Sequence, residues 1–129
     1  MKLARVTIPF LIGFFLYALI EIAARGYTHW TMALTGGVVF AALCHMFRNA
    51  PPAMPLPLLY LCGAVIITTA ELSVGVAVNL YLHWNVWDYS DVPMNFHGQI
   101  CPLYSCFWYL LCIPARYLWQ MVDRQLKAG

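Results

Sequence analysis

Residues 83–98 read HWNVWDYSDVPMNFHG and form the only long segment that is neither an apolar run nor a basic flank. Before this segment, residues 56–82 form an apolar run interrupted by one carboxylate, Glu71, and one amide, Asn79. A further apolar run begins at Ile100. A polar and aromatic loop between two segments of bilayer length predicts a place for chemistry or recognition at the edge of a membrane protein.

The composition supports a membrane location for the whole chain. Of its 129 residues, 63% are hydrophobic and 9% are charged, whereas soluble domains carry about 25% charged residues. A soluble fold could not cover its surface with so few charges, so residues 1–129 are predicted to form a single integral membrane domain. The five cysteines contain no C-x-x-C pair and are interpreted as small apolar packing residues. The net charge of +2 gives no reason to expect a nucleic-acid partner.

The hydropathy pattern predicts an all-α membrane protein built as a bundle of four transmembrane helices. Because about 20 residues cross a hydrocarbon core of about 30 Å, we place these helices over about residues 6–24, 30–47, 58–82 and 100–119. Gly36 and Gly37 near the middle of the second helix are small enough for close helix packing. The polar and aromatic segment then becomes a structured outer loop between the third and fourth helices.

The distribution of basic residues predicts the orientation. Six of the seven would lie on the side that holds both termini and the 48–57 loop: Lys2, Arg5, Arg48, Arg116, Arg124 and Lys127. Only Arg25 falls on the opposite side. Because lysine and arginine collect on the cytoplasmic side, we expect a multi-pass protein of the plasma or inner membrane with both termini in the cytoplasm.

Glu71 is the first candidate for a functional residue because it lies deep within an apolar run. A charged group at the centre of a bilayer costs about 2.5–3.5 kcal/mol on insertion scales, so the side chain should face a partner or a cavity. Thr68, Gly75 and Asn79 share its helical face. This face predicts a polar stripe that rises toward the loop. The alternative is a structural glutamate that bonds to a neighbouring helix.

Glu21, Arg25 and His29 follow one another at the outer end of the first helix. The i, i+4 spacing of Glu21 and Arg25 suits a local ion pair. In the alternative interpretation, Arg25 neutralises both Glu21 and Glu71. Histidines and acidic residues on this side could in principle bind a divalent metal, but no ligand spacing supports a metal site. Neither a metal nor another cofactor is predicted.

The loop supplies the remaining candidates. An aromatic belt at the membrane interface would explain some of its rings, but it does not explain the polar residues packed beside them. The mixture predicts a structured loop with its own turns. The candidate binding residues of this loop are Trp87, Asp88, Tyr89, Ser90, Asn95 and Gly98.

Two parts of the chain carry a resemblance to a known family. The first part contributes Glu71, Gly75, Asn79, Trp87, Asp88, Tyr89, Ser90, Pro93, Asn95, Gly98, Ile100, Ser105 and Trp108. The second part, YALIEIAARGYTHWTMALTGG, contributes Glu21, Arg25, His29, Trp30, Gly36 and Gly37. The two parts resemble short, clostridial-type members of the type IV ABC-transporter permease family, which consists of bacterial membrane proteins. The resemblance implies a role in transport.

The favoured function is therefore a transporter permease or substrate-capture subunit with a polar site around Glu71 and the loop. The alternatives are an accessory or structural membrane protein, or a small membrane-embedded enzyme that modifies the envelope with Glu71 as acid or base. The chain has no Walker A motif, so ATP hydrolysis would need a separate subunit. Expected partners are the lipid bilayer and a second copy or another membrane subunit. An ATPase subunit is a less favoured partner, because the internal cytoplasmic loop 48–57 is short and proline-rich. No catalytic residue is assigned, and an enzyme is the less favoured interpretation.

Overall fold

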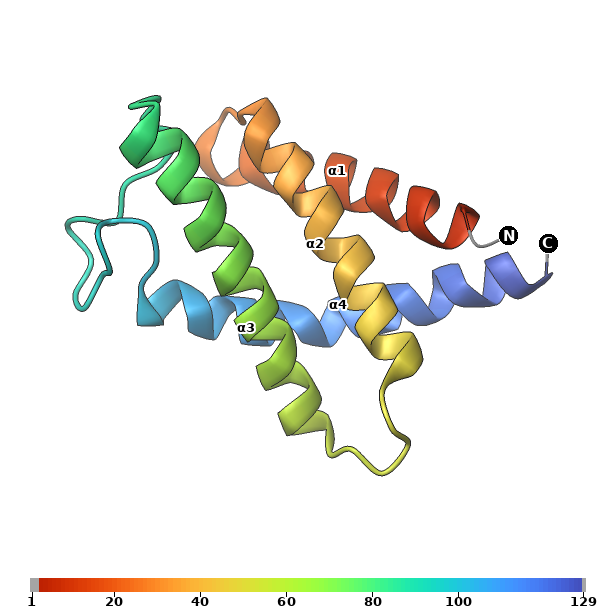
Figure 1. Cartoon of the computed structure of the whole chain (residues 1–129). Coiled ribbons are helices and arrows are strands. Elements are labelled where there is room, and N and C mark those ends of the chain that lie inside the picture. The colour runs from red at the N-terminus through yellow and green to blue at the C-terminus, as the bar shows by residue number, and fades with distance from the viewer. Residues whose placement is uncertain (1–2, 129) are drawn as a thin grey trace.

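The computed structural model describes residues 3–128, and within that range it contains helices and no strand. The elements in chain order are α1 (Ala4–Arg25), α2 (Trp30–Asn49), α3 (Leu56–Gly75), the π-helix η1 (Val76–Tyr81) and α4 (Pro102–Ala128) (Figure 1). The prediction of an all-helical protein is confirmed. Lys2, one of the residues used to predict the orientation, lies outside the described range.

The helix boundaries follow local chain chemistry. Gly26 ends α1 with a left-handed φ of 81°, and its N–H donates to the carbonyl oxygen of Ile22. Consecutive prolines after Ala50 stop α2, and Pro57 in the first turn of α3 needs no helical N–H donor. The third segment is helical from Leu56 to Tyr81, close to the predicted range, and its last part is the π-helix η1. Helix α4 extends to Ala128, so the polar segment after residue 119 is helical as well.

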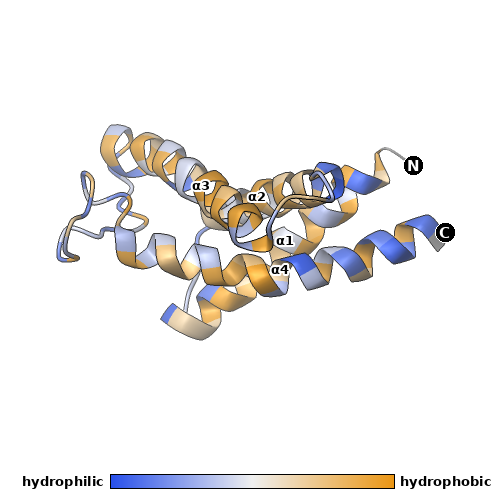
Figure 2. Cartoon of the chain, turned by 90° about the horizontal axis from the view of Figure 1, so that it is seen from below, coloured by the Kyte–Doolittle hydropathy of each residue, from blue (hydrophilic) through white to orange (hydrophobic). Residues whose placement is uncertain are grey.

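Three helical segments are long and apolar enough to span a membrane: Ala4–Arg25, Trp30–Asn49 and Leu56–Tyr81. In α4 the N-terminal half is mostly hydrophobic, whereas hydrophilic residues dominate its C-terminal half (Figure 2). The polar end of α4 lowers its mean hydropathy. A fourth transmembrane passage therefore stays a prediction.

The helices place the two ends of the chain together. The N- and C-terminal ends lie at one end of the molecule, and the loop between η1 and α4 lies at the opposite end (Figure 1). Helix α1 packs along α2, while α3 packs against both α2 and α4. The main apolar core joins α2, α3 and α4 and contains Leu43, Phe47, Leu59, Tyr60, Ile67 and Cys112.

The contact between α1 and α2 depends on glycines from both helices. A Cβ at Gly13 would lie 2.6 Å from the carbonyl oxygen of Gly36, and a Cβ at Gly37 would lie 2.8 Å from that of Phe10. These distances leave no room for a side chain. The expectation that Gly36 and Gly37 allow close helix packing is thus confirmed, and Gly13 is their partner on α1.

Replacing Gly37 with leucine should destabilise the protein by about 1–3 kcal/mol, the usual cost of overpacking. The neighbouring Val38 is 55% exposed, so Val38→Leu is a matched control that should change stability by less than about 0.5 kcal/mol. Titration of the micelle-bound protein with a denaturing detergent measures both variants. Equal midpoints for Gly37→Leu and the parent chain would contradict the packing described here.

A charged cluster holds the C-terminal half of α4 to the end of α2. Asp123 Oδ1 lies 3.4 Å from Arg48 Nε, and Asp123 Oδ2 lies 3.2 Å from Lys127 Nζ. Burial tends to raise the pKa of Asp123, but the hydrogen bonds and positive charges of Lys127 and Arg48 outweigh it and lower that pKa. The polar end of α4 is therefore anchored to the bundle.

Candidate functional site

Glu71 lies on α3 with 9% of its surface exposed. Its Oε2 accepts a hydrogen bond of 2.8 Å from the Tyr89 hydroxyl, and its Oε1 accepts one of 3.3 Å from Trp108 Nε1. The carboxyl group thus joins α3 to the loop and to α4. Two bonds use about half of the acceptor capacity of a carboxylate, which leaves capacity for a further donor.

Tyr89 is fixed by its neighbours as well as by Glu71. Its ring stacks on Tyr104 of α4, with centroids 4.6 Å apart and an angle of 9° between the planes. Burial, followed by the charge of Glu71, raises the pKa of the Tyr89 hydroxyl. The hydroxyl therefore stays protonated and donates a hydrogen bond to the carboxyl group of Glu71.

The π-helix η1 directs Asn79 into the loop. The backbone N–H of Val86 donates to Asn79 Oδ1 at 2.6 Å, and Asn79 Nδ2 donates to Gln99 Oε1 at 2.8 Å. Gln99 is 3% exposed, its Nε2 donates to the carbonyl oxygen of His97, and its own carbonyl oxygen accepts from Trp87 Nε1. Wider π-helical turns often occur at functional sites. Here the turn joins both ends of the loop to α3.

Gly75 lies one helical turn beyond Glu71, between the carboxyl group and Asn79. A Cβ at this position would lie 2.6 Å from Gln99 Oε1 and 3.0 Å from Trp87 Cζ2. The glycine thus lets the loop approach the α3 backbone. Glu71, Gly75 and Asn79 share one face, as the sequence predicted, and the loop covers that face. Thr68 instead contacts Ser105 of α4, with 3.0 Å between their hydroxyl oxygens.

Arg25 belongs to a separate pair. Its Nε lies 2.7 Å from Glu21 Oε2, although the Nε–H finds no aligned acceptor within residues 3–128. Its Nη1 donates to the carbonyl oxygen of Val86 at 3.3 Å. In the described part of the chain Glu71 takes part in no ion pair. The interpretation of Arg25 as a shared counter-charge was therefore wrong, and the local pair with Glu21 is observed.

His29 caps the N-terminus of α2. Its Nδ1 accepts the backbone N–H of Thr31 at 3.2 Å, and its ring stacks against Trp30. A capping histidine has an evident structural task. Within residues 3–128, no group of three histidine, cysteine, aspartate or glutamate side chains is arranged to hold a metal ion.

The polar loop residues organise the loop itself. Asp88 accepts hydrogen bonds from the N–H and hydroxyl of Ser90, which hold the pKa of Asp88 below its usual value. Asn95 donates to the carbonyl oxygen of Ser90, and its own Oδ1 accepts the N–H of Gly98. Gly98 has a φ of 73°, and a Cβ there would lie 2.7 Å from Asp88 Oδ1. Asp88 and Ser90 are exposed, whereas Gly98 is buried, and its carbonyl oxygen accepts the N–H of Tyr89 at 2.7 Å. The turns made by these four residues therefore hold the backbone of the residue that donates to Glu71.

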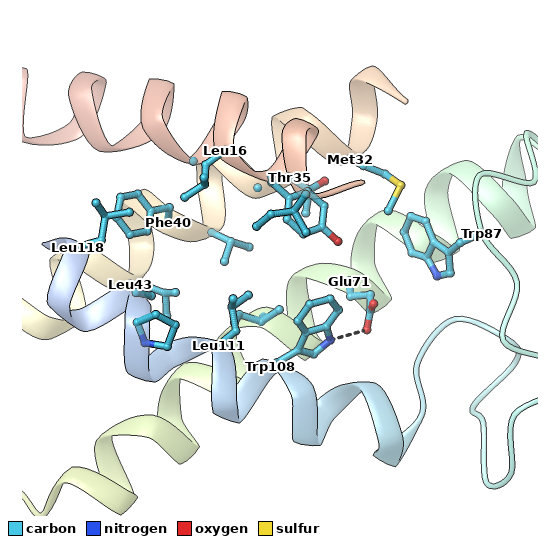
Figure 3. A pocket seen from close by; sticks show the side chains of 18 residues that line it. Leu16, Met32, Thr35, Phe40, Leu43, Glu71, Trp87, Trp108, Leu111 and Leu118 are labelled. Atoms are coloured by element: carbon cyan, nitrogen blue, oxygen red, sulfur yellow. Dashed lines mark hydrogen bonds between the residues drawn. The ribbon is translucent and has the colours of Figure 1, made fainter. Parts of the chain in front are cut away.

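A cavity of about 340 Å³ lies beside Glu71, between α1 and α2 on one side and α4 on the other (Figure 3). Glu71, Met32 and Trp87 lie at one end, and Phe40 and Leu118 lie at the other. The walls between these ends are mostly aliphatic and aromatic. Of the sequence-predicted candidates, only Glu71 and Trp87 line this cavity.

Two residues of the site were missed as functional candidates. Trp108 donates to Glu71 and lines the cavity, and Gln99 connects Asn79 to the loop. Trp108 lies in an apolar run, where tryptophan usually indicates packing or the membrane interface. The only signal for Gln99 was its position as an amide next to Gly98 in the polar segment.

Comparison with known proteins supplies the family. Residues 9–128 match the family described as "Putative ABC-transporter type IV". The chain belongs to this family. The family and the three span-length helices together make it a transport-related membrane protein. A comparison with curated proteins and one with solved structures gave no significant match.

The match includes every residue that lines the cavity, from Gly13 on α1 to Leu118 on α4. The resemblance noted from residues 17–37 and 71–108 is therefore confirmed at the level of the family. The description of this family provides the context for interpreting the cavity.

Proposed function

We propose that this protein is the permease or substrate-capture subunit of a transporter, with the cavity beside Glu71 as its substrate site. The observation that carries the proposal is a lone carboxyl group at one end of a mostly apolar cavity. An acidic residue within a transmembrane segment is costly and usually marks a substrate or ion pathway. The position of Glu71 therefore favours transport over a purely structural role.

In this proposal the chain crosses the plasma or inner membrane four times. The helices Ala4–Arg25, Trp30–Asn49 and Leu56–Tyr81 supply three passages, and the N-terminal half of α4 supplies the fourth. Both termini lie in the cytoplasm, and the loop 82–101 faces outward, as the positive-inside rule favours. The site then opens near the outer end of the bundle.

Four helices surround only part of a transport pathway, so the working transporter contains a second copy or another membrane subunit. An ATPase subunit would meet the cytoplasmic end of the molecule. Hydrophilic residues dominate the C-terminal half of α4, which Asp123 anchors to Arg48 of α2. A movement of this half of α4 would also displace Trp108, which lies on the same helix.

The proposed topology predicts where a new cysteine can be labelled. Met94 is 84% exposed at the loop, so Met94→Cys in intact cells should react with a membrane-impermeant maleimide. Gln125→Cys on α4 should react only after lysis, and the unsubstituted chain gives the background from its own cysteines. Labelling of Met94→Cys only after lysis would contradict the orientation.

The proposed function predicts a change in solute distribution. In a strain that lacks the protein, mass spectrometry of cells and medium should find at least one compound that shifts between the two. The wild-type chain should restore the distribution, whereas Glu71→Gln, expressed at an equal level, should leave it as in the deletion strain. An accessory role would produce no shift, or a shift that Glu71→Gln corrects as well as the wild type does.

A further inference from the structure

The shape of the cavity restricts what it can hold. Its lining follows α4 from Trp108 to Leu118, which at 1.5 Å per residue is a length of about 15 Å. A volume of about 340 Å³ is near the lower limit for small-molecule sites, which measure about 300–1,000 Å³. A long and narrow apolar space suits one extended hydrocarbon chain. A lipid with two chains would need more room.

The polar groups lie toward one end of this space. Glu71 supplies the carboxyl group, and the Trp87 and Trp108 rings lie beside it (Figure 3). Thr35 also lines the cavity, but its hydroxyl is engaged with the carbonyl oxygen of Thr31 at 2.6 Å. A ligand group that reaches this end therefore meets a hydrogen-bond acceptor and two tryptophan rings.

No positive charge balances Glu71 within the cavity. Among residues 3–128 no lysine or arginine lines it, and the nearby Arg25 is paired with Glu21 and bonded to Val86. An anionic head group would thus meet a carboxylate without a cation. A positively charged head group would gain the attraction of that carboxylate.

We propose that the cavity binds a single-chain amphiphile with a positively charged amine or ammonium head, which lies at Glu71 while the hydrocarbon chain extends toward Phe40 and Leu118. The inference rests on the proposed function and gives its substrate class. On binding, the head group loses part of its hydration shell and gains contacts with Glu71, Trp87 and Trp108. The chain is removed from water by the aliphatic walls.

Dodecyltrimethylammonium is a suitable probe because it combines one chain with a fixed positive charge. Radiolabelled probe is added to the full chain in phosphatidylcholine nanodiscs, and binding to empty nanodiscs is subtracted. The wild-type chain should bind it saturably, and dodecanoate should not compete. Glu71→Gln should weaken binding about tenfold or more, since it removes the negative charge that attracts the ammonium head.

A second pair of variants tests the location. Ala115 lines the cavity, so Ala115→Phe should fill it and abolish binding. Leu110 lies on the same helix with 56% exposure and does not line the cavity, so Leu110→Phe should bind the probe as the wild type does. Unfolding midpoints show that each variant is folded. Unchanged binding by Glu71→Gln or by Ala115→Phe, or competition by dodecanoate, would overturn the proposal.

The binding experiment and the transport experiment can fail independently of each other. If the probe does not bind but a compound still shifts between cells and medium in a Glu71-dependent way, the substrate class is wrong and transport stands. If the probe binds as expected but no compound shifts, the ligand site stands and the transport role is wrong.

Discussion

Glu71→Leu should destabilise the protein by about 2–6 kcal/mol. The Tyr89 hydroxyl and the Trp108 N–H both donate to this carboxyl group, and each buried donor left without an acceptor costs about 1–3 kcal/mol. Leucine offers no acceptor to either. Detergent-denaturation midpoints measure the loss, and a stability equal to that of the wild type would show that the two bonds contribute nothing.

Two further variants identify the cause. Glu71→Gln should cost much less, because the amide oxygen can accept from Trp108 while the amide nitrogen donates to the Tyr89 hydroxyl, which can also accept. Tyr89→Phe combined with Glu71→Leu should recover part of the stability, because it removes one unpaired donor. A double variant that is less stable than Glu71→Leu alone would mean that the Tyr89 hydroxyl has another partner.

Asn79→Leu should have an effect of similar size and should also release the loop. Asn79 accepts the N–H of Val86 and donates to Gln99, and both partners are buried. Leucine leaves the N–H of Val86 and the side chain of Gln99 without these hydrogen bonds, and each loss lowers the stability by about 1–3 kcal/mol. Chymotrypsin should then cleave faster at Phe96, which lies in the loop and is already 53% exposed.

A charged replacement and a surface control sharpen this test. Asn79→Asp keeps an acceptor for the N–H of Val86 but places a second oxygen against Gln99 Oε1, so it should also destabilise the protein. Gln99 cannot simply reverse its amide, because its Nε2 already donates to His97. Asn49 is exposed, and Asn49→Leu should change stability by less than about 0.5 kcal/mol. Loop cleavage at the wild-type rate in Asn79→Leu would contradict the role of Asn79.

The sequence by itself determined the helices and the face of α3 that carries the site. Hydropathy over a window of about 20 residues is a local property, and lipid forces each apolar segment to satisfy its own backbone hydrogen bonds as a helix. The alignment of Glu71, Gly75 and Asn79 follows from helical periodicity. Polar residues ended the helices, so the loop could be located as well. The hydrophobic half of α4 was recognised, but its extension to Ala128 was not, because polar helical turns resemble a tail.

Only the tertiary structure decided which groups meet at Glu71. Its two donors lie 18 and 37 positions later in the chain, and their distance from the carboxyl group depends on how α4 and the loop pack against α3. The same packing leaves the cavity and brings Arg25 to the carbonyl oxygen of Val86. Hydrophobic patterns specify which face of a helix is buried. They do not specify the rotation and sliding of packed helices by a few ångströms, and hydrogen bonds of about 3 Å require that precision.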